Sequence, residues 1–417
     1  MFGQNPCARV QPIRLATPFM SGLSSNSVNP PQTSPAAPKP LRVLLLGQRL
    51  GFGGAERQLG MLARGLSERG HDVTFAVLYN EDPMAANLIG TNVRIVDLAK
   101  RSRYDMVAFL RHWFTLIAST KPDVVHGYLP VPNLLSLAAR RGSPRPIIVW
   151  GLRASNMDRS RHDWLDRATR WLESWLSRWA DLIIVNSEAG AADARQRGLP
   201  DDRIAVVANG IDIARFRPDT AARGTARAMW GIACDVPVIG HVARIDPMKD
   251  HATFLSAIAI LRRSLPAVRA VCVSAGSEPQ RAELRARAGA IGLAETVQIV
   301  APGLDVATVM NGFDVLCLSS AFGEGFPNVV GEAMACGVPC VVTATGDAPA
   351  LVGDTGAIVP PRDSEAMAAA LLTMTRRVAS EQAGLAGRTR AQIAPWTQER
   401  LIAETERLLI QQVVRQR

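Results

Sequence analysis

The sequence predicts an α/β protein of two domains, each a doubly wound parallel sheet. Short apolar runs alternate with amphipathic segments of helical period, as they do in parallel βαβ units. The alternation pauses at a polar, turn-rich stretch at 215–225, which reads as a linker, and then starts again. A chain of 417 residues also exceeds the size of one ordinary domain. We therefore expect two successive Rossmann-like halves.

The first domain is expected to span residues 41–215. It opens with the apolar run LRVLLLG, which ends in glycine as a buried parallel strand does, and a helix should follow up to Gly70. Further strands are expected at 71–79, 92–98, 123–128, 146–151, 181–187 and 204–212. The other helices are expected at 105–119, 131–141, 163–180 and 188–197.

The second domain is expected to span residues 216–395. Its strands are expected at 237–243, 269–276, 296–303, 314–320 and 339–344. Its helices are expected at 251–264, 279–291, 305–311, 327–336 and 365–379. A last helix, within 396–417, is expected to cross back to the first domain.

Residues 1–40 differ in composition from the rest of the chain. They hold eight of the 27 prolines and only three charged residues, so they cannot form a core. We expect a disordered leader, and a misassigned start of the chain is the alternative.

Charge and cysteine usage narrow the class of protein. The net charge of +10 permits three kinds of partner: nucleic acid, an anionic membrane surface or an anionic small substrate. No nucleic-acid reader motif is present, so we expect no nucleic-acid partner. Most of the six cysteines stand in apolar runs without zinc-type spacing, which favours a reducing cytoplasm. No run of 18 apolar residues exists, and no continuous apolar signal segment opens the chain.

The tryptophan-rich segment at 163–180 allows two interpretations. Apolar residues recur there every three or four positions, which favours a helix packed on the sheet. Six arginines lie on or near the same segment, and tryptophan with arginine suits a lipid headgroup layer. Both hold if the apolar stripe faces the core and the arginines face lipid.

The first motif that suits a ligand is GFGGAER, between a strand and a helix. Gly53 and Gly54 remove side chains where a backbone approaches a ligand, and the helix start attracts phosphate. The motif is not a dinucleotide fingerprint, because Glu56 stands where the third glycine belongs. Taken alone, it fits a tight structural turn equally well.

The second motif is HVARIDPMKDH at 241–251, again between a strand and a helix. Arg244 and Lys249 lie five residues apart across a turn, and two such cations at strand ends can clamp a diphosphate. In isolation, two solvated surface charges are the simpler interpretation.

The third motif, SSAFGEGFPNVVGEAMACGVPCVVT at 319–343, is the most specific. It reads as strand, glycine-rich turn, helix and strand, with Glu324 in the loop and Glu332 inside an apolar helix, where a carboxylate needs a partner. A nucleotide would place its phosphates on the helix start and its ribose hydroxyls on Glu332. The residues expected at that start are Gly325, Phe326, Pro327, Asn328 and Val329.

With EGFPNVVGE, GHVARIDPMKD, VANGID and GGAER together, the chain resembles the family 4 retaining glycosyltransferases of the GT-B fold, which carry an E-x7-E signature. The resemblance covers about residues 41–415. It implies two Rossmann-like domains that face each other across a cleft, with the donor mainly on the second domain and the acceptor on the first.

The resemblance also implies roles for single residues. Arg244 and Lys249 match the pair that contacts the diphosphate, and Glu332 matches the glutamate that binds the ribose. Glu324 matches the glutamate near the transferred sugar, and His126 matches a histidine beside that sugar. Gly53 and Gly54 match the glycine loop that closes over the phosphates. The catalytic set implied in this way is Glu324, His126, Arg244 and Lys249.

The activity implied is retaining transfer of a sugar from a nucleotide diphosphate, with UDP favoured over GDP, to a hydroxyl of a lipid-linked or polysaccharide acceptor. No metal and no cofactor are expected. Cell-surface polysaccharide biosynthesis in the cytoplasm, at the inner face of the membrane, fits these expectations. A non-catalytic nucleotide-sugar-binding subunit and a nucleotide-sugar epimerase remain the alternatives.

Overall fold

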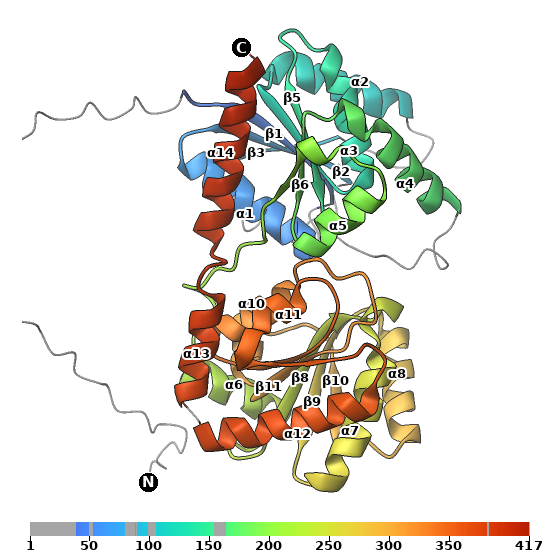
Figure 1. Cartoon of the computed structure of the whole chain (residues 1–417), viewed down its shortest axis with the longest axis vertical. Helices are drawn as coiled ribbons and strands as arrows, with labels where there is room; N and C mark the ends of the chain where they lie inside the picture. Colours follow the sequence, from blue (N-terminus) through green and yellow to red (C-terminus); the bar gives the residue numbers. More distant parts are fainter. Residues whose placement is uncertain are drawn as a thin grey trace, which may run out of the picture.

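The computed structural model describes residues 39–49, 53–79, 88, 90–98, 106–153, 164–381 and 383–416. It has two parallel sheets, one in each half of an elongated molecule, with helices on both faces of each sheet (Figure 1). This confirms the predicted fold class. Nearly all of the expected leader lies outside the described residues.

The first sheet has seven parallel strands in the order β3-β2-β1-β4-β5-β6-β7. The strands are β1 (Arg42–Arg49), β2 (Asp72–Tyr79), β3 (Arg94–Asp97), β4 (Val124–Tyr128), β5 (Ile147–Leu152), β6 (Leu182–Val185) and β7 (Ile204–Val206). The helices are α1 (Gly54–Glu68), α2 (Met106–Thr120), α3 (Pro130–Ser136), α4 (Trp164–Leu176) and α5 (Glu188–Gln196). Short 3-10 turns follow α3 and α4, and another precedes β7. The strand expected over 204–212 therefore ends six residues early, where the chain leaves the domain.

The second sheet has six parallel strands in the order β10-β9-β8-β11-β12-β13. The strands are β8 (Val238–Arg244), β9 (Arg269–Ala275), β10 (Val297–Val300), β11 (Val315–Leu318), β12 (Cys340–Thr343) and β13 (Ala357–Val359). The helices are α6 (Thr220–Trp230), α7 (His251–Ser264), α8 (Glu278–Ala290), α9 (Val306–Asn311), α10 (Asn328–Ala335), α11 (Ala348–Val352), α12 (Ser364–Glu381) and α13 (Ala383–Ile393). The elements β13, α11 and α13 were not anticipated from the sequence.

The expected linker at 215–225 is wrong in its second half, because α6 begins within it. The Asp219 side chain caps this helix by accepting the N–H of Ala222 at 2.9 Å. Ala226 and Trp230 then bury one face of α6 in the core of the second domain. The segment at 220–225 was predicted as a linker because it is polar, but it forms the start of a capped helix whose apolar face is narrow.

The prediction that the tryptophans of the 163–180 segment face the core is also wrong for the described side chains of α4. Trp171 is 67% exposed and Trp175 is 48% exposed. The inward face carries Glu173 instead, and its carboxylate accepts from Arg197 at 2.7 Å and from Asn133 at 3.0 Å. This buried polar network sets the rotation of α4. The side chains of Trp164 and Leu165 lie outside the described residues.

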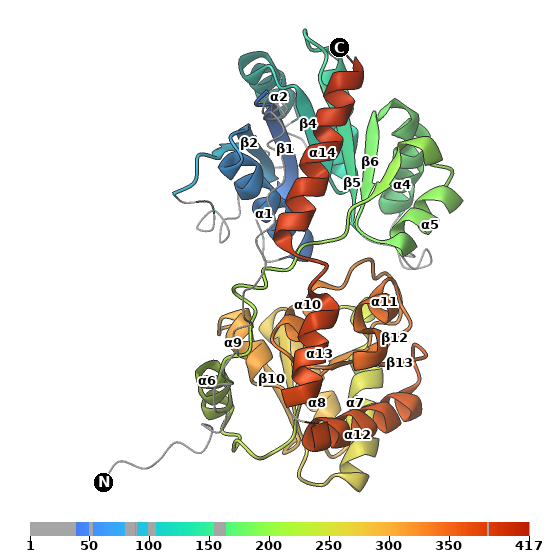
Figure 2. The same cartoon turned by 60° about the vertical axis from the view of Figure 1, so that its left-hand side comes forward.

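The chain crosses between the two domains twice, first in the crossing segment at 210–216 and again near Trp396, and these two stretches are hydrogen-bonded to each other. The N–H of Ile211 donates to the carbonyl of Trp396 at 2.9 Å, and the N–H of Gln398 donates to the carbonyl of Ile211 at 3.1 Å. Gly210 permits this approach, because a Cβ there would lie 2.6 Å from the Cα of Gln398. Beyond this point α14 (Gln398–Gln416) runs along the first domain (Figure 2).

Helix α14 packs on α1, and four of its apolar side chains join the first domain's core: Leu401, Ile402, Leu409 and Val413. The fit is close, because a Cβ on Gly65 of α1 would lie 2.2 Å from Ile402. The C-terminal end of the chain thus completes the core of its N-terminal domain. Among the described helices, none is long and apolar enough to cross a membrane.

Candidate active site

The strand order of each sheet marks where a ligand should bind. The order reverses beside β1 and β4 in the first sheet, and beside β8 and β11 in the second. A crevice forms at the carboxyl ends of the strands at such a point. The predicted site residues lie on these four strands or in the loops and helices that follow them. The two edges face each other, since the carbonyl of Gly54 accepts from the Asn328 side chain at 3.4 Å.

The glycine loop opens α1 at the edge of the first domain. Gly53 is the N-cap residue and Gly54 is the first helical residue. A Cβ on Gly54 would lie 2.8 Å from Nδ2 of Asn328, so a larger residue would displace the Asn328 side chain. The glycine at this position therefore allows close contact with Asn328 of the second domain, and the predicted approach of a ligand to this loop stays a prediction.

The structure brings Lys249 and Glu324 together. Nζ of Lys249 forms an ion pair with Oε1 of Glu324, and Oγ of Ser320 donates to the same oxygen at 2.5 Å. Lys249 stands in a 3-10 turn directly after β8, and Glu324 in the loop after β11. The carboxylate thus fixes the ammonium group at the switch point of the second sheet.

Arg244, the other predicted cation, ends β8 and is exposed. In the part of the chain that the structure describes, no ion pair joins it to Glu324 or to another carboxylate. Its guanidinium is therefore available to a ligand at the same sheet edge. Among the described residues, no three His, Cys, Asp or Glu side chains converge on a point that a metal ion would occupy.

The start of α10 lies against the first domain. The helix begins at Asn328, with Pro327 as its N-cap residue, so Gly325 and Phe326 precede it. Gly325 is buried, and a Cβ there would lie 2.6 Å from the Asn186 side chain of the first domain. The Phe326 side chain packs into the hydrophobic core of the second domain instead of facing the cleft.

The first turn of α10 contributes two predicted residues, Asn328 and the partly buried Val329. The Asn328 side chain connects the crossing segment to the helix, because its Oδ1 accepts from Nδ2 of Asn209 at 2.8 Å. The backbone N–H groups available at the helix start are those of Asn328 and Val329, fewer than the sequence suggested.

Glu332 lies further along α10 and is 5% exposed. Its carboxylate accepts from Nη2 of Arg57 at 2.8 Å, across the gap between the domains. A cavity of about 730 Å³ adjoins this pair and is lined by residues of α1, the crossing segment and α14. Arg57 belongs to the GGAER motif. The sequence could not predict its pairing with Glu332, because no fixed spacing relates these two residues of different domains.

His126 is the middle residue of β4 and is fully buried. Burial lowers the pKa of His126 well below its ordinary value, and the nearby Arg153 lowers it further, so the ring is neutral. Neither ring nitrogen has a hydrogen-bond partner among the described residues. Among the described residues, no hydrogen bond or ring contact joins His126 to the predicted residues of the second domain.

Comparisons with known proteins agree with this arrangement. Residues 52–215 match the sequence profile of Glycosyltransferase Family 4, and residues 236–377 match that of Glycosyl transferases group 1. EpsF of Bacillus subtilis, named as a glycosyltransferase, is 27% identical over 308 residues, which are 72% of this chain and 79% of EpsF.

The D-inositol 3-phosphate glycosyltransferases of Saccharomonospora viridis and Mycobacterium marinum are 33% and 34% identical. These alignments cover 48% and 52% of this chain, and they span about half the length of the two relatives, 48% and 46%.

Solved structures share the fold at lower identity. Anabaena HepE in complex with UDP-glucose superposes with a TM-score of 0.76 at 22% identity, covering 88% of this chain and 98% of HepE. WaaG, a glycosyltransferase involved in lipopolysaccharide biosynthesis, gives a TM-score of 0.67 at 16% identity, covering 88% of this chain and 99% of WaaG. The chain is a glycosyltransferase of the family 4 type, with two domains arranged in the GT-B fold.

Proposed function

We propose that the protein is a retaining glycosyltransferase that moves a sugar from a UDP-sugar to a hydroxyl of a lipid-linked or polysaccharide acceptor. The observation that carries the proposal is the ion pair of Lys249 and Glu324 at the switch point, opposite the Gly54 loop. HepE has the same fold and was solved with UDP-glucose, which supports UDP over GDP. Arg244 and Lys249 would bind the diphosphate, and Glu332 the ribose.

The difficult step is departure of the diphosphate, which gains negative charge as the bond to the anomeric carbon stretches. Lys249, Arg244 and the start of α10 would stabilise that charge in a closed cleft. Glu324 is already paired with Lys249, so it is not a free carboxylate nucleophile. Retention would then arise by same-face attack: the acceptor oxygen bonds the anomeric carbon while the departing phosphate oxygen takes the hydroxyl proton.

The diphosphate clamp is tested with Lys249→Ala and Arg244→Ala. Each change removes a cation that stabilises the leaving group, so turnover should fall about a hundredfold, on the order of 3 kcal/mol. Turnover and UDP affinity are measured by a coupled assay and by calorimetry. Arg263→Ala, an exposed arginine at the end of α7, is the control. Wild-type turnover in both clamp variants would remove the assignment.

The donor is tested by thermal shift with UDP- and GDP-sugars. A ligand that binds the native state raises the unfolding midpoint with its occupancy, so UDP-sugars should raise it and GDP-sugars should not. Slow hydrolysis of the stabilising donor without acceptor would support catalysis over a non-catalytic binding subunit. A midpoint that no nucleotide sugar changes would contradict the proposed function.

We also propose a cytoplasmic location on the anionic inner face of the membrane, through the outer face of α4 and the turn after it. The rings of Trp171 and Trp175 stack with centroids 6.3 Å apart, and Trp179 packs edge-on to Trp175 at 5.2 Å. The guanidinium of Arg178 lies 4.7 Å and 4.8 Å from the last two rings. Exposed indoles beside a cation suit a headgroup layer with anionic lipid.

Co-sedimentation with liposomes tests this location. The wild type should sediment with vesicles that contain phosphatidylglycerol and stay in solution with phosphatidylcholine alone. The double change Trp171→Ser and Trp175→Ser should abolish sedimentation. Met229→Ser, at an exposed position on α6, is the matched control. Equal sedimentation of the wild type with both kinds of vesicle would argue against this surface. Undiminished sedimentation of the double variant would argue against it as well.

A further inference from the structure

Arg153 stands directly after β5, at the carboxyl edge of the first sheet, and no carboxylate pairs with it among the described residues. Its Nη1 donates to Oδ1 of Asn209 at 3.2 Å, and its guanidinium carbon lies 4.0 Å from the centre of the Tyr128 ring. Its Nε is buried without a hydrogen-bond partner among the described residues. In that part of the chain it forms no ion pair with a carboxylate.

Two other arginines with little exposure differ from the partly buried Arg153 in this respect. Arg197 pairs with Glu173 at 2.7 Å, and Arg227 pairs with Asp314 at 2.7 Å. Removing a cation from water without a counterion costs several kcal/mol, so proteins rarely keep one in that state for stability. Burial also lowers the pKa of Arg153 from its ordinary value. Among the described residues, Arg153 is therefore a cation without a carboxylate partner at the carboxyl edge of the first sheet.

The groups around Arg153 are also without partners. Tyr128 is 2% exposed and its hydroxyl makes no hydrogen bond among the described residues. The ring of His126 lies 4.8 Å from that of Tyr128, and both of its nitrogens are likewise unpartnered. Native proteins satisfy the great majority of buried polar atoms. Three neighbouring side chains with unmet hydrogen bonds point to a ligand that supplies the missing oxygens.

The cluster lies next to the proposed donor site. Asn209 accepts from Arg153 and donates to Asn328 at the start of α10, so one side chain separates Arg153 from the helix that faces the diphosphate. We propose that Arg153, bordered by Tyr128 and His126, binds an anionic oxygen of a reactant, from a phosphate or a carboxylate. This inference rests on the proposed function, and it adds a cation from the acceptor-side domain.

The anionic oxygen has two possible sources, the donor's diphosphate or an acidic group on the acceptor. Calorimetry distinguishes them with UDP, uridine and inorganic phosphate. If the donor supplies it, Arg153→Met weakens UDP at least about tenfold and leaves uridine unchanged. If the acceptor supplies it, UDP binds normally, while binding of phosphate to the UDP-saturated wild type is lost in the variant. Arg195→Met, at an exposed position on α5, is the matched control.

Stability separates this role from a structural one. Replacing a partly buried cation that has no carboxylate partner among the described residues by an apolar chain should leave the ligand-free unfolding midpoint of Arg153→Met unchanged or raised. Arg153→Lys, which keeps the charge but loses the planar fork, should retain part of the anion binding. The inference is overturned if Arg153→Met fails to fold, or if it binds UDP and phosphate as the wild type does. Absence of UDP binding by the wild type would instead overturn the proposed function.

Discussion

Single side chains join the two domains at the site, and Glu332 shows this most directly. Its carboxylate is fixed by Arg57 from the opposite domain, and one carboxylate oxygen is engaged in that pair. A charged group held in this way is oriented before any ligand arrives, which reduces the entropy lost on binding. The residue that should recognise the ribose thus also joins the domains.

Replacing Glu332 by Gln tests that role. The change removes the charge but keeps the size, so a charge-assisted hydrogen bond to the ribose becomes a neutral one. We expect UDP affinity, measured by calorimetry, to fall about tenfold. Affinity for 2′,3′-dideoxy-UDP should be unchanged by the substitution. Equal losses for both nucleotides would mean that Glu332 does not contact the hydroxyls.

A buried histidine near the clamp should make stability depend on pH. Burial lowers the pKa of His251 from 6.5 to about 4, with Asp250 opposing and Lys249 adding to the shift. Between these values the unfolded state binds the extra proton, so stability is lost as pH falls from 6.5 towards 4, by about 1.4 kcal/mol per pH unit. Urea unfolding of His251→Gln should show a shallower pH slope than the wild type. Parallel slopes would contradict the shift.

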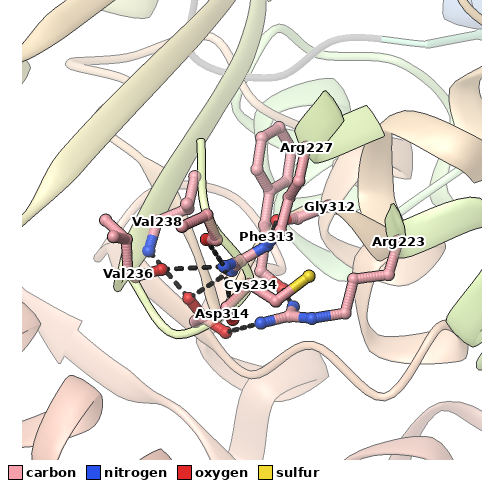
Figure 3. A network of polar contacts seen from close by, with 9 residues as sticks. Arg223, Arg227, Cys234, Val236, Val238, Gly312, Phe313 and Asp314 are labelled. Atoms are coloured by element: carbon pink, nitrogen blue, oxygen red, sulfur yellow. Dashed lines mark hydrogen bonds and ion pairs between the residues drawn. The ribbon is translucent and has the colours of Figure 1, made fainter. Parts of the chain in front are cut away.

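Among the elements, α6 owes its position to one polar network (Figure 3). The buried guanidinium of Arg227 donates to four backbone carbonyls and to Oδ2 of Asp314. The same carboxylate accepts the N–H of Val238, and its other oxygen accepts from Arg223. The network ties α6 to the starts of β8 and β11, the strands that position the clamp.

Asp314→Ala should therefore be strongly destabilising. It leaves the Arg227 charge buried and unpaired, which costs about 3–5 kcal/mol in the free energy of unfolding. Asp219→Ala, which removes only the cap of the same helix, should cost about 1 kcal/mol. Chemical denaturation measures both losses. Similar losses for the two variants would show that the ion pair contributes no more than the cap.

For the whole molecule, contacts between the domains hold the cleft in the observed arrangement. The carboxylate of Asp347, before α11, accepts the N–H groups of Glu188 and Ala189 at 2.9 and 3.0 Å. These groups open α5 in the first domain, where a helix start favours an anion. The pair of Arg57 and Glu332 and the hydrogen bond from Asn328 to Gly54 are further polar contacts across the gap.

Removing one contact should shift the ligand-free protein towards open arrangements. Asp347→Ala should increase the radius of gyration measured by small-angle X-ray scattering, and saturating UDP-sugar should restore the wild-type value, because ligand binding favours closure. Asp354→Ala, at an exposed position of the second domain, is the control. An unchanged radius without ligand would show that Asp347 does not hold the domains together.

The sequence by itself determined the two parallel α/β domains, because strand and helix periods are local properties of the chain. It also placed Lys249 and Glu324 at strand ends, and the topology of parallel sheets brings such ends together. The tertiary structure decided what depends on partners distant in sequence. The buried Glu173 turned the tryptophans of α4 outward, and Arg57 reached Glu332 across the domains. The sequence likewise could not predict that Arg153 is partly buried without a carboxylate partner among the described residues, because burial is a property of the packed chain.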